Sequence, residues 1–352
     1  MESPHKLLIR ATNWVGDAVM SLPALRMVRA RFPQAHIAVL AKPWVADLYG
    51  RETWLNEVIP YTPQPGRGDW GAKWRAAREI GRMGFDVALL LPNSFESAAV
   101  AFAARIPERI GYARDGRGLL LTRALAVPKR GEIPAHETFY YLELVRRAGW
   151  LRELPATAHP VLEGVEAARV AGEGLLAEVG LFGEKGLSGG VLGVSPGAAF
   201  GTAKRWYPER FAAAALRVAE ERGWGVALFG SGGERALCDE VRAALAGKVR
   251  GVHNFAGETT LRQFIDAAAA CRLFFTNDSG AMHIAYAVGV PTVAVFGPTD
   301  HIGTGPSGEH TRIVREPVDC SPCKLRECPI DHRCMKRVEA DAVARTALEL
   351  LK

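Results

Sequence analysis

Short apolar runs alternate with amphipathic stretches along most of the 352-residue chain. A short apolar run between turn signals is typical of a buried strand, and apolar residues at helical spacing are typical of a helix. In the first half this pattern predicts strands at 6–11, 36–41, 57–60, 85–91 and 108–112. Helices are predicted near 17–31, 43–50, 70–83, 94–104 and 136–149. Such alternation indicates a parallel sheet covered on both faces.

A second series of the same kind follows a looser stretch. From 150 to 189 the chain reads "LPATAHPVLEG", a helical segment and "GEKGLSGG", which is typical of a linker. Strands are then predicted at 190–195, 224–229, 251–255, 272–276 and 291–296, and helices at 208–222, 234–246, 260–270 and 281–288. The fold class indicated is α/β, with two Rossmann-like doubly wound domains facing a central cleft.

The two series give the expected domain boundaries. An N-terminal Rossmann-like domain is expected at 1–165, a linker region at 166–189 and a C-terminal Rossmann-like domain at 190–335. A last helix within 336–352 can fold back and tie the lobes together. Because ligands of such sheets bind outside the carboxyl ends of the strands, functional side chains are expected in the loops there.

Composition and charge narrow the class of protein. The chain is 48% hydrophobic and 23% charged, and its longest apolar runs, such as "VALLL" and "VPTVAVF", are far shorter than the ~18 residues that cross a bilayer. No long apolar segment precedes the first polar residues, so no secretory signal is visible and a cytoplasmic location is expected. The net charge of +6 and the pI of about 9.1 indicate an anionic partner.

The basic excess is concentrated in one stretch. Two acids, Glu108 and Asp115, stand there against seven basic residues: Arg105, Arg109, Arg114, Arg117, Arg123, Lys129 and Arg130. Nucleic acid, lipid head groups or a phosphorylated sugar would each suit such a cluster, and so would a solvated arginine-rich loop.

Common nucleotide-binding motifs are missing from the sequence. It contains no G-x-x-x-x-G-K-[ST], which disfavours a P-loop NTPase. The stretch "GSGGER" begins like a dinucleotide fingerprint, but Arg235 stands at the third glycine position and prevents close packing of helix on strand. A nicotinamide-dependent dehydrogenase is therefore disfavoured as well.

Two loops after predicted strands are suited to a diphosphate. In "TNDSGAMHIA" a buried strand passes through Asn277-Asp278-Ser279-Gly280 into a helix whose N-terminus carries partial positive charge. Asp278 as a simple helix cap and His283 as a packed core histidine are the alternatives. In "SPGAAFGTAKRW" glycines precede Lys204, which can meet a phosphate as a compact charge, or can be an ordinary surface lysine.

A third corner follows the first strand, where "RATNWVGDAVMSLP" turns through Gly16-Asp17 into a long helix. Asp17 is either the helix cap or a carboxylate that takes part in chemistry.

Four of the six cysteines lie close together in "CSPCKLRECPIDHRC", namely Cys320, Cys323, Cys328 and Cys334. The C-x2-C pair is half of a zinc site, but the spacings that follow are unusual for one. A structural zinc ion, redox-labile disulfides and plain thiols all stay open. Cys238 and Cys271 are expected in the core.

Six motifs in this order resemble those of the ADP-heptose:lipopolysaccharide heptosyltransferases of glycosyltransferase family 9, from about residue 6 to 300. They are "NWVGDAVMSLP", "LPNSFESA", "PGAAFGTAKRW", "LFGSGGE", "NFAGET" and "TNDSGAMHIA…PTVAVFGPTD". The longer N-W-V-G-D and A-K-R-W forms favour the type II branch. The resemblance implies a GT-B fold and an inverting transfer of heptose from ADP-L-glycero-D-manno-heptose to the inner core, heptosyl-Kdo2-lipid A.

The resemblance also implies roles for single residues. Asp17 maps onto the proposed catalytic base and Lys204 onto the donor-phosphate contact that assists catalysis. The implied donor-binding residues are Gly16, Lys204, Glu234 (ribose), Thr259 (adenine), Asp278, Ser279, Gly280 and His283. An inverting transfer needs one base and no second carboxylate nucleophile. No cofactor is expected for the chemistry, and the sequence does not indicate whether a divalent cation is needed.

The implied acceptor is anionic and joined to a lipid, which suits the basic stretch and predicts transient association with the inner-membrane surface. Asn93, Ser94, Arg109 and Arg114 are the candidate acceptor contacts. Heptosyltransferase I and a protein-directed heptosyltransferase are alternatives within the class. A basic nucleic-acid-binding protein is the alternative outside it; it is disfavoured because the basic stretch offers only Tyr112 for stacking, so no nucleic-acid partner is expected.

Overall fold

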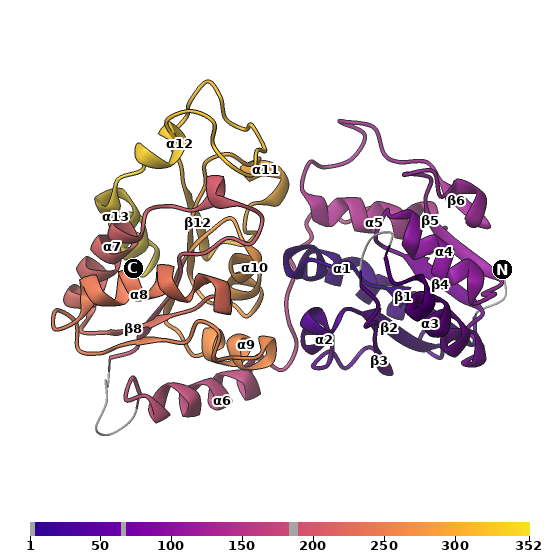
Figure 1. Cartoon of the computed structure of the whole chain (residues 1–352), viewed down its shortest axis with the longest axis horizontal. Coiled ribbons are helices and arrows are strands. Elements are labelled where there is room, and N and C mark those ends of the chain that lie inside the picture. The colour runs from indigo at the N-terminus through magenta and orange to yellow at the C-terminus, as the bar shows by residue number, and fades with distance from the viewer. Residues whose placement is uncertain (1–3, 65–67, 183–188) are drawn as a thin grey trace. The chain divides into compact units, whose positions relative to one another are not determined.

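The computed structural model describes residues 4–64, 68–182 and 189–352. The chain forms two compact units, Met1–Pro160 (unit 1) and Val161–Lys352 (unit 2). Each unit is built on a parallel sheet with helices on its two faces (Figure 1). In the described residues every helix is too short or too polar to cross a membrane.

Unit 1 holds a six-stranded sheet of order β3-β2-β1-β4-β5-β6 among its described residues. Its strands are β1 (Lys6–Arg10), β2 (His36–Ala41), β3 (Glu57–Pro60), β4 (Val87–Leu90), β5 (Glu108–Tyr112) and β6 (Arg123–Leu125). Its helices are α1 (Val15–Arg31), α2 (Pro43–Tyr49), α3 (Trp70–Arg82), α4 (Phe95–Ala103), η1 (Gly118–Leu120) and α5 (Glu137–Arg147). All neighbouring strands run parallel.

Unit 2 repeats this architecture with the order β12-β11-β10-β7-β8-β9. Its strands are β7 (Val191–Ser195), β8 (Gly225–Leu228), β9 (Val252–Asn254), β10 (Leu273–Asn277), β11 (Thr292–Val295) and β12 (Thr311–Val314). Its helices are α6 (Val165–Glu178), η2 (Thr202–Lys204), α7 (Pro208–Arg222), η3 (Gly232–Glu234), α8 (Arg235–Leu245), α9 (Leu261–Ala269), α10 (Gly280–Ala287), α11 (His301–Thr304), α12 (Arg333–Lys336) and α13 (Ala340–Leu350).

The central strands are mostly apolar because both faces of each sheet are covered by helices. All residues of β4, β7 and β10 are buried, as the runs "VALL", "VLGVS" and "LFFTN" predict. Every strand predicted from the pattern is present. The short edge strands β6 and β12 are additional to the prediction.

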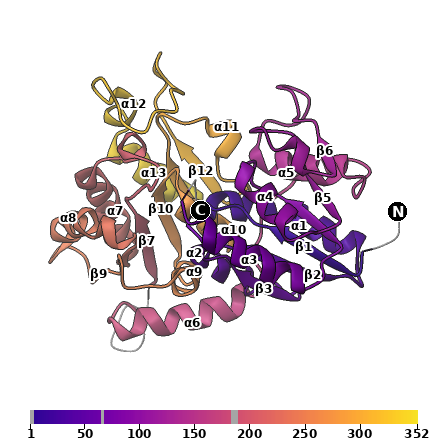
Figure 2. The ribbon, with the colours of Figure 1, turned by 45° about the vertical axis from the view of Figure 1, so that its right-hand side comes forward.

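The boundary between the units differs from the expected one. It falls at Pro160/Val161, whereas the pattern suggested 165/166 followed by a linker at 166–189. Much of that stretch is helix α6, which lies against α9 in both views (Figures 1 and 2). The reason is close packing: the backbone at Gly172 is so near the carbonyl of Asp266 that a Cβ would overlap it. The end of the expected linker, 183–188, lies outside the described residues.

The C-terminal helix belongs to unit 2. Helix α13 packs on α7, β11 and β12, and Trp206 Nε1 donates to the Val338 carbonyl at 3.2 Å. The expected boundary at 335/336 falls inside α12. That the helix also ties the two units together stays a prediction.

Candidate functional site

Each sheet has one position where the connections from two neighbouring strands run in opposite directions along the sheet, which is called the topological switch point. In unit 1 this switch point lies between β1 and β4, and in unit 2 between β7 and β10. Ligands of doubly wound sheets bind outside the carboxyl ends of the strands at such points. The loops after these four strands carry Asp17, Asn93, Lys204 and Asp278. The motifs found in the sequence therefore fall on the two positions where the fold predicts binding.

Asp17 is not the cap of α1. The N-cap is Trp14, whose side chain makes no capping hydrogen bond, and Asp17 lies in the first turn of the helix. Its carboxylate is partly exposed, and Tyr141 Oη donates to Asp17 Oδ1 at 3.3 Å. Burial raises the pKa of Tyr141 well above its usual value, and the Asp17 charge adds to that effect. The tyrosine therefore keeps its proton at neutral pH and remains a hydrogen-bond donor to Asp17.

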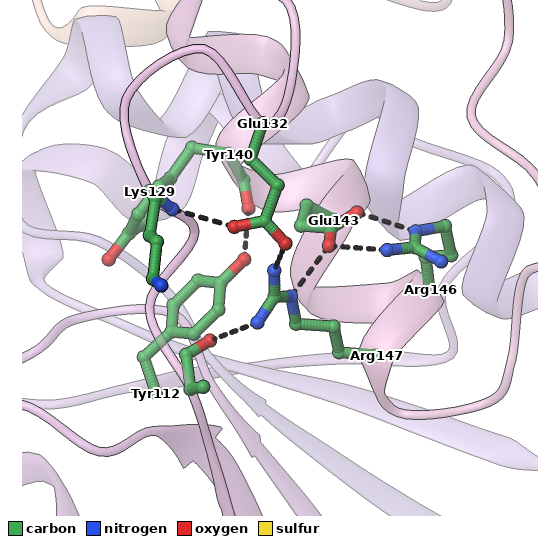
Figure 3. A network of polar contacts seen from close by, with 8 residues as sticks. Tyr112, Lys129, Glu132, Tyr140, Glu143, Arg146 and Arg147 are labelled. Carbon is green, nitrogen blue, oxygen red and sulfur yellow. Dashed lines mark hydrogen bonds and ion pairs between the residues drawn. The ribbon is translucent and has the colours of Figure 1, made fainter.

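Helix α5 carries this tyrosine and is anchored by the ionic network in Figure 3. Glu143 is buried and accepts from Arg146 and Arg147 at 2.6–2.7 Å. Burial opposes ionisation of Glu143, but the two guanidiniums outweigh it and lower its pKa. Tyr112 Oη also donates to the Tyr140 carbonyl at 2.9 Å. The Glu143 pairs lie within α5, whereas the Tyr112 bond and a bond from Arg147 to the Ala126 carbonyl at 3.0 Å tie the helix that carries Tyr141 to neighbouring segments.

The candidate acceptor residues have different surroundings. Asn93 Nδ2 donates to Tyr140 Oη at 2.9 Å, so this side chain is tied to α5 beside the switch point. Ser94 is the N-cap of α4, with its hydroxyl accepting from the Ser97 amide. Arg109 lies in β5 and donates to the carbonyls of Ile106 and Leu120, away from the carboxyl end of the strand. Arg114 follows β5 and is exposed.

Two further arginines of the basic stretch have partners inside the unit, whereas Arg105, Lys129 and Arg130 are exposed. Arg117 is fully buried and donates to the Tyr112 carbonyl, the Pro92 carbonyl and Ser97 Oγ. Arg123 pairs with Glu108 at 2.9 Å. Sequence spacing had grouped these arginines as one surface, whereas the loop after β5 encloses Arg117 and turns its charge inward.

Sequence reasoning missed two cations at the carboxyl edge of the unit 1 sheet. Arg10 ends β1 and Lys42 follows β2, and both approach the Tyr61 ring, at 4.7 and 4.6 Å from its centroid. Burial lowers the pKa of Arg10 to about 10, which leaves it charged at neutral pH. Their position directly after apolar strands was the signal that could have revealed them, because side chains there face the crevice.

In unit 2 the switch point is bridged by an ion pair. Lys204 Nζ lies 2.7 Å from Asp278 Oδ2, joining the loop after β7 to the corner after β10. The Asp278 residue is only 4% exposed. Asp278 is not a helix cap, since Ser279 occupies the N-cap position of α10. The two motifs read separately in the sequence thus form one contact.

Asn277 fixes the backbone of the loop after β7 that carries Lys204 (residues 196–206, here called the lysine loop). Its amide nitrogen donates to the Pro196 carbonyl at 2.7 Å, and its oxygen accepts from the Trp206 amide at 2.9 Å. Both ends of the loop are therefore tied to the end of β10. This constraint holds Lys204 beside Asp278.

Glu234 lies at the neighbouring strand end, after β8. Its Oε2 accepts from the Ser231 amide at 2.9 Å and from the Ser231 hydroxyl at 2.8 Å. The backbone of Gly197 approaches it so closely that a Cβ there would overlap the carboxylate. Thr259, after β9, is partly exposed beside Thr260, which caps α9. Glu234 thus adjoins the lysine loop.

Three of the remaining candidates, Ser279, Gly280 and His283, lie at the start of α10, and the fourth, Gly16, lies on unit 1. Gly280 is the first helical residue, and Ser279 Oγ lies 3.1 Å from Thr276 Oγ1. His283 is buried, with Nδ1 3.1 Å from Tyr286 Oη. Gly16, on unit 1, is in the first turn of α1 just before Asp17.

The cysteine segment packs on the back of the lysine loop. His332 Nε2 donates to the Ala203 carbonyl at 2.8 Å, and Nδ1 lies 3.2 Å from Tyr207 Oη. The Ala203 amide donates to the Arg326 carbonyl at 2.9 Å. The segment therefore holds the backbone at Ala203, directly before Lys204, through both its amide and its carbonyl.

All six cysteines are free, and Cys238 and Cys271 are buried as expected. A small cavity of about 60 Å³ is lined by Cys320, Cys323, Cys328 and Cys334. Within the described ranges no group of three or more His, Cys, Asp or Glu side chains is arranged to hold a metal ion. The geometry therefore gives the zinc prediction no support.

Two doubly wound units with polar corners at both switch points are the architecture of the GT-B glycosyltransferases. The family model described as "Glycosyltransferase family 9 (heptosyltransferase)" matches residues 73–333. Lipopolysaccharide heptosyltransferase 2 of Salmonella typhimurium is 35% identical over 88% of each chain. The solved structure of E. coli ADP-heptose lps heptosyltransferase II covers 98% of both chains at 30% identity and a TM-score of 0.83. The chain belongs to glycosyltransferase family 9.

The match to the other branch is shorter. Lipopolysaccharide heptosyltransferase 1 of Pseudomonas aeruginosa is 32% identical over 31% of this chain. The type 2 relatives therefore share far more of this sequence. This agrees with the branch that the N-W-V-G-D and A-K-R-W motifs favour.

Proposed function

We propose that this chain transfers heptose from ADP-heptose to the inner core of lipopolysaccharide, as the type 2 heptosyltransferases do. The observation that carries the proposal is the Lys204–Asp278 pair at the switch point of unit 2, on a chain matched over 88% of its length by a heptosyltransferase 2. Heptosyl-Kdo2-lipid A is the proposed acceptor. The shorter match to a type 1 enzyme makes heptosyltransferase I the second candidate.

The proposed chemistry is a single displacement with inversion. Asp17 takes the proton of the acceptor hydroxyl while the hydroxyl oxygen forms its bond to the anomeric carbon of the heptose. The bond from that carbon to the diphosphate oxygen breaks, and ADP leaves with the electron pair. Lys204 and the N-terminus of α10 stabilise the charge that develops on the leaving diphosphate. These residues supply the base and the positive charge without a cofactor.

Donor recognition is proposed to follow the three adjoining strand ends of unit 2. Lys204, Asp278, Ser279 and Gly280 would hold the diphosphate, with His283 close to the sugar. Glu234 would accept hydrogen bonds from the ribose hydroxyls, and Thr259 would lie against the adenine. The support is spatial: the Gly197 contact brings Glu234 against the lysine loop.

Acceptor recognition is proposed for the edge of unit 1. Of the four candidate contacts from the sequence, Asn93 and the exposed Arg114 are kept in the proposal, and Arg10 and Lys42 add positive potential at the same carboxyl edge. Kdo carboxylates and phosphates are ligands that such groups attract. Since lipid A is embedded in a bilayer, we also propose transient association with the inner membrane.

The test compares wild type with Asp17→Asn in transfer from ADP-heptose to heptosyl-Kdo2-lipid A. The variant should bind ADP normally and turn over at least ~100-fold more slowly, the scale of a lost general base. Glu153→Gln, an exposed carboxylate of unit 1, is the matched control and should stay active. Normal turnover by Asp17→Asn would remove the base; transfer to Kdo2-lipid A in preference to its heptosylated form would favour the type I activity.

A further inference from the structure

Helices α3 and α4 of unit 1 carry aromatic side chains that the core does not use. Trp70 and Trp74 lie one turn apart on α3 and are 50% and 58% exposed. Phe95 and Phe102 lie two turns apart on one side of α4 and are half exposed. The two helices pack against each other. We call these four side chains the α3–α4 aromatic face.

Two of the four rings, Trp70 and Trp74, line a groove of about 210 Å³ between α3 and α4. The other lining residues are Lys73, Ala77, Ala99, Val100 and Ala103. The Lys73 ammonium lies 5.0 Å from the Trp70 ring centroid and pairs with Glu96 at 3.3 Å, which supports that ring from below. The groove is therefore an apolar surface of rigid rings at the outside of the unit.

The surroundings of the face are basic. Arg75, Arg78 and Arg82 are exposed on α3, where the exposed acid is Glu79. The Arg109 guanidinium lies 5.3 Å from the Phe102 ring centroid. Indole and phenyl rings flanked by arginines match the boundary of a bilayer, where rings enter the interface and guanidiniums pair with lipid phosphates.

We propose that the α3–α4 aromatic face docks on the surface of an anionic phospholipid bilayer. Charge complementarity selects this occupant, because exposed arginines at the apolar groove need an acidic, laterally adaptable partner. Within the Arg105–Arg130 stretch, Arg117 and Arg123 have partners inside the unit, so the proposal does not rely on their charges. It rests on the proposed function only for the statement that the acceptor is carried by a lipid.

The test is co-sedimentation of the full chain with vesicles of phosphatidylglycerol and phosphatidylethanolamine, and with phosphatidylcholine alone. Binding is expected for the anionic vesicles and should weaken with salt. Trp70→Ser combined with Trp74→Ser should lower partitioning at least ~10-fold. Arg75→Gln combined with Arg78→Gln should lower it several-fold and flatten the salt dependence. Val170→Ser and Arg345→Gln, exposed positions of unit 2, are the matched controls and should bind as wild type.

The proposal would be overturned if the double tryptophan variant bound anionic vesicles as well as wild type does, or if wild type bound both kinds of vesicle equally. So would a tryptophan-dependent dimer in sedimentation with no vesicle binding, which would assign the face to a second copy of the chain. Vesicle binding needs neither donor nor acceptor, so it does not depend on heptose transfer. If wild type transfers heptose, the double tryptophan variant should no longer transfer it to an acceptor embedded in vesicles. The same variant should still transfer heptose to that acceptor sugar without its lipid.

Discussion

At the scale of single residues, the two sites differ in how their charged groups are held. Asp17 lies in the first turn of α1, where the helix dipole favours a negative charge, and the neutral Tyr141 hydroxyl donates a hydrogen bond to it. Asp278 is buried and paired directly with Lys204. A carboxylate with a neutral partner can accept a proton during a reaction, whereas a buried ion pair serves better as a fixed charge. The assignment of base and phosphate contact follows this difference.

Tyr141→Phe tests the hydrogen bond at Asp17. Because the raised pKa of Tyr141 keeps it protonated, wild type offers Asp17 a donor at every working pH. Removing a donor disfavours the charged carboxylate, so more basic solution is needed to form the active base. The acidic limb of the kcat/KM profile should therefore move to higher pH, with ADP affinity unchanged. A limb that stays in place would show that this hydrogen bond does not tune the base.

Lys204→Ala tests the phosphate contact. A hydrogen bond to a charged group contributes ~1.5–3 kcal/mol, so the Kd for ADP should rise about 10- to 100-fold by calorimetry. The change also removes the ion-pair partner of the buried Asp278, at a loss of roughly 3 kcal/mol in the free energy of unfolding. Lys204→Arg should retain most of the affinity, and Lys248→Ala, at an exposed lysine, should change neither quantity. Lost stability with wild-type ADP affinity would leave the pair a purely structural role.

At the scale of elements, positions are set by contacts between segments far apart in sequence. The cysteine segment holds the lysine loop through His332 and Arg326, and α5 holds Tyr141 toward Asp17. Helix α6 is the clearest example of such packing. It joins unit 2 because Gly172 lets its backbone pack closely against α9. The local sequence "VEAARVAGEGLLAE" does not predict this contact.

Two glycines of α6 make a matched pair for this contact. At Gly172 a Cβ would overlap the Asp266 carbonyl of α9, so Gly172→Ala should push the helices apart and lower the free energy of unfolding by ~1–3 kcal/mol. At Gly174 a Cβ meets nothing, so Gly174→Ala should raise it by about 0.5–1 kcal/mol through helix propensity. Urea denaturation measures both. Equal effects at the two positions would contradict the close packing of α6 on α9.

The sequence predicted the elements better than their surroundings. Buried parallel strands are nearly all apolar, so β1, β4, β7 and β10 were evident, whereas the edge strands β6 and β12 contain arginine and resemble loops. Asp17, Lys204 and Asp278 were found because they follow apolar runs. Arg117 was misread as surface, since its burial depends on the path of a loop. Arg10 and Lys42 were not singled out, since Arg10 falls within the predicted strand 6–11 and Lys42 between the predicted strand 36–41 and helix 43–50.

At the scale of the whole molecule, each unit has its own sheet, its own switch point and its own buried core. The proposed donor residues other than Gly16 all belong to unit 2, and the proposed base and acceptor residues belong to unit 1. With these roles, the division would separate the binding of ADP from the transfer step. It predicts that unit 2 separated at the boundary still binds ADP but no longer transfers heptose.

Residues 161–352, expressed alone, test that division. Because α6, α13 and both ends of the lysine loop are anchored within unit 2, the fragment should unfold cooperatively. It should bind ADP within about threefold of the full chain, since interfaces between domains of one chain are usually weak, and it should transfer no heptose because it lacks Asp17. Lys204→Ala in the fragment should weaken ADP binding as it does in the full chain. A folded fragment without ADP affinity would mean that unit 1 contributes to the donor site, through Gly16 or another residue of its edge.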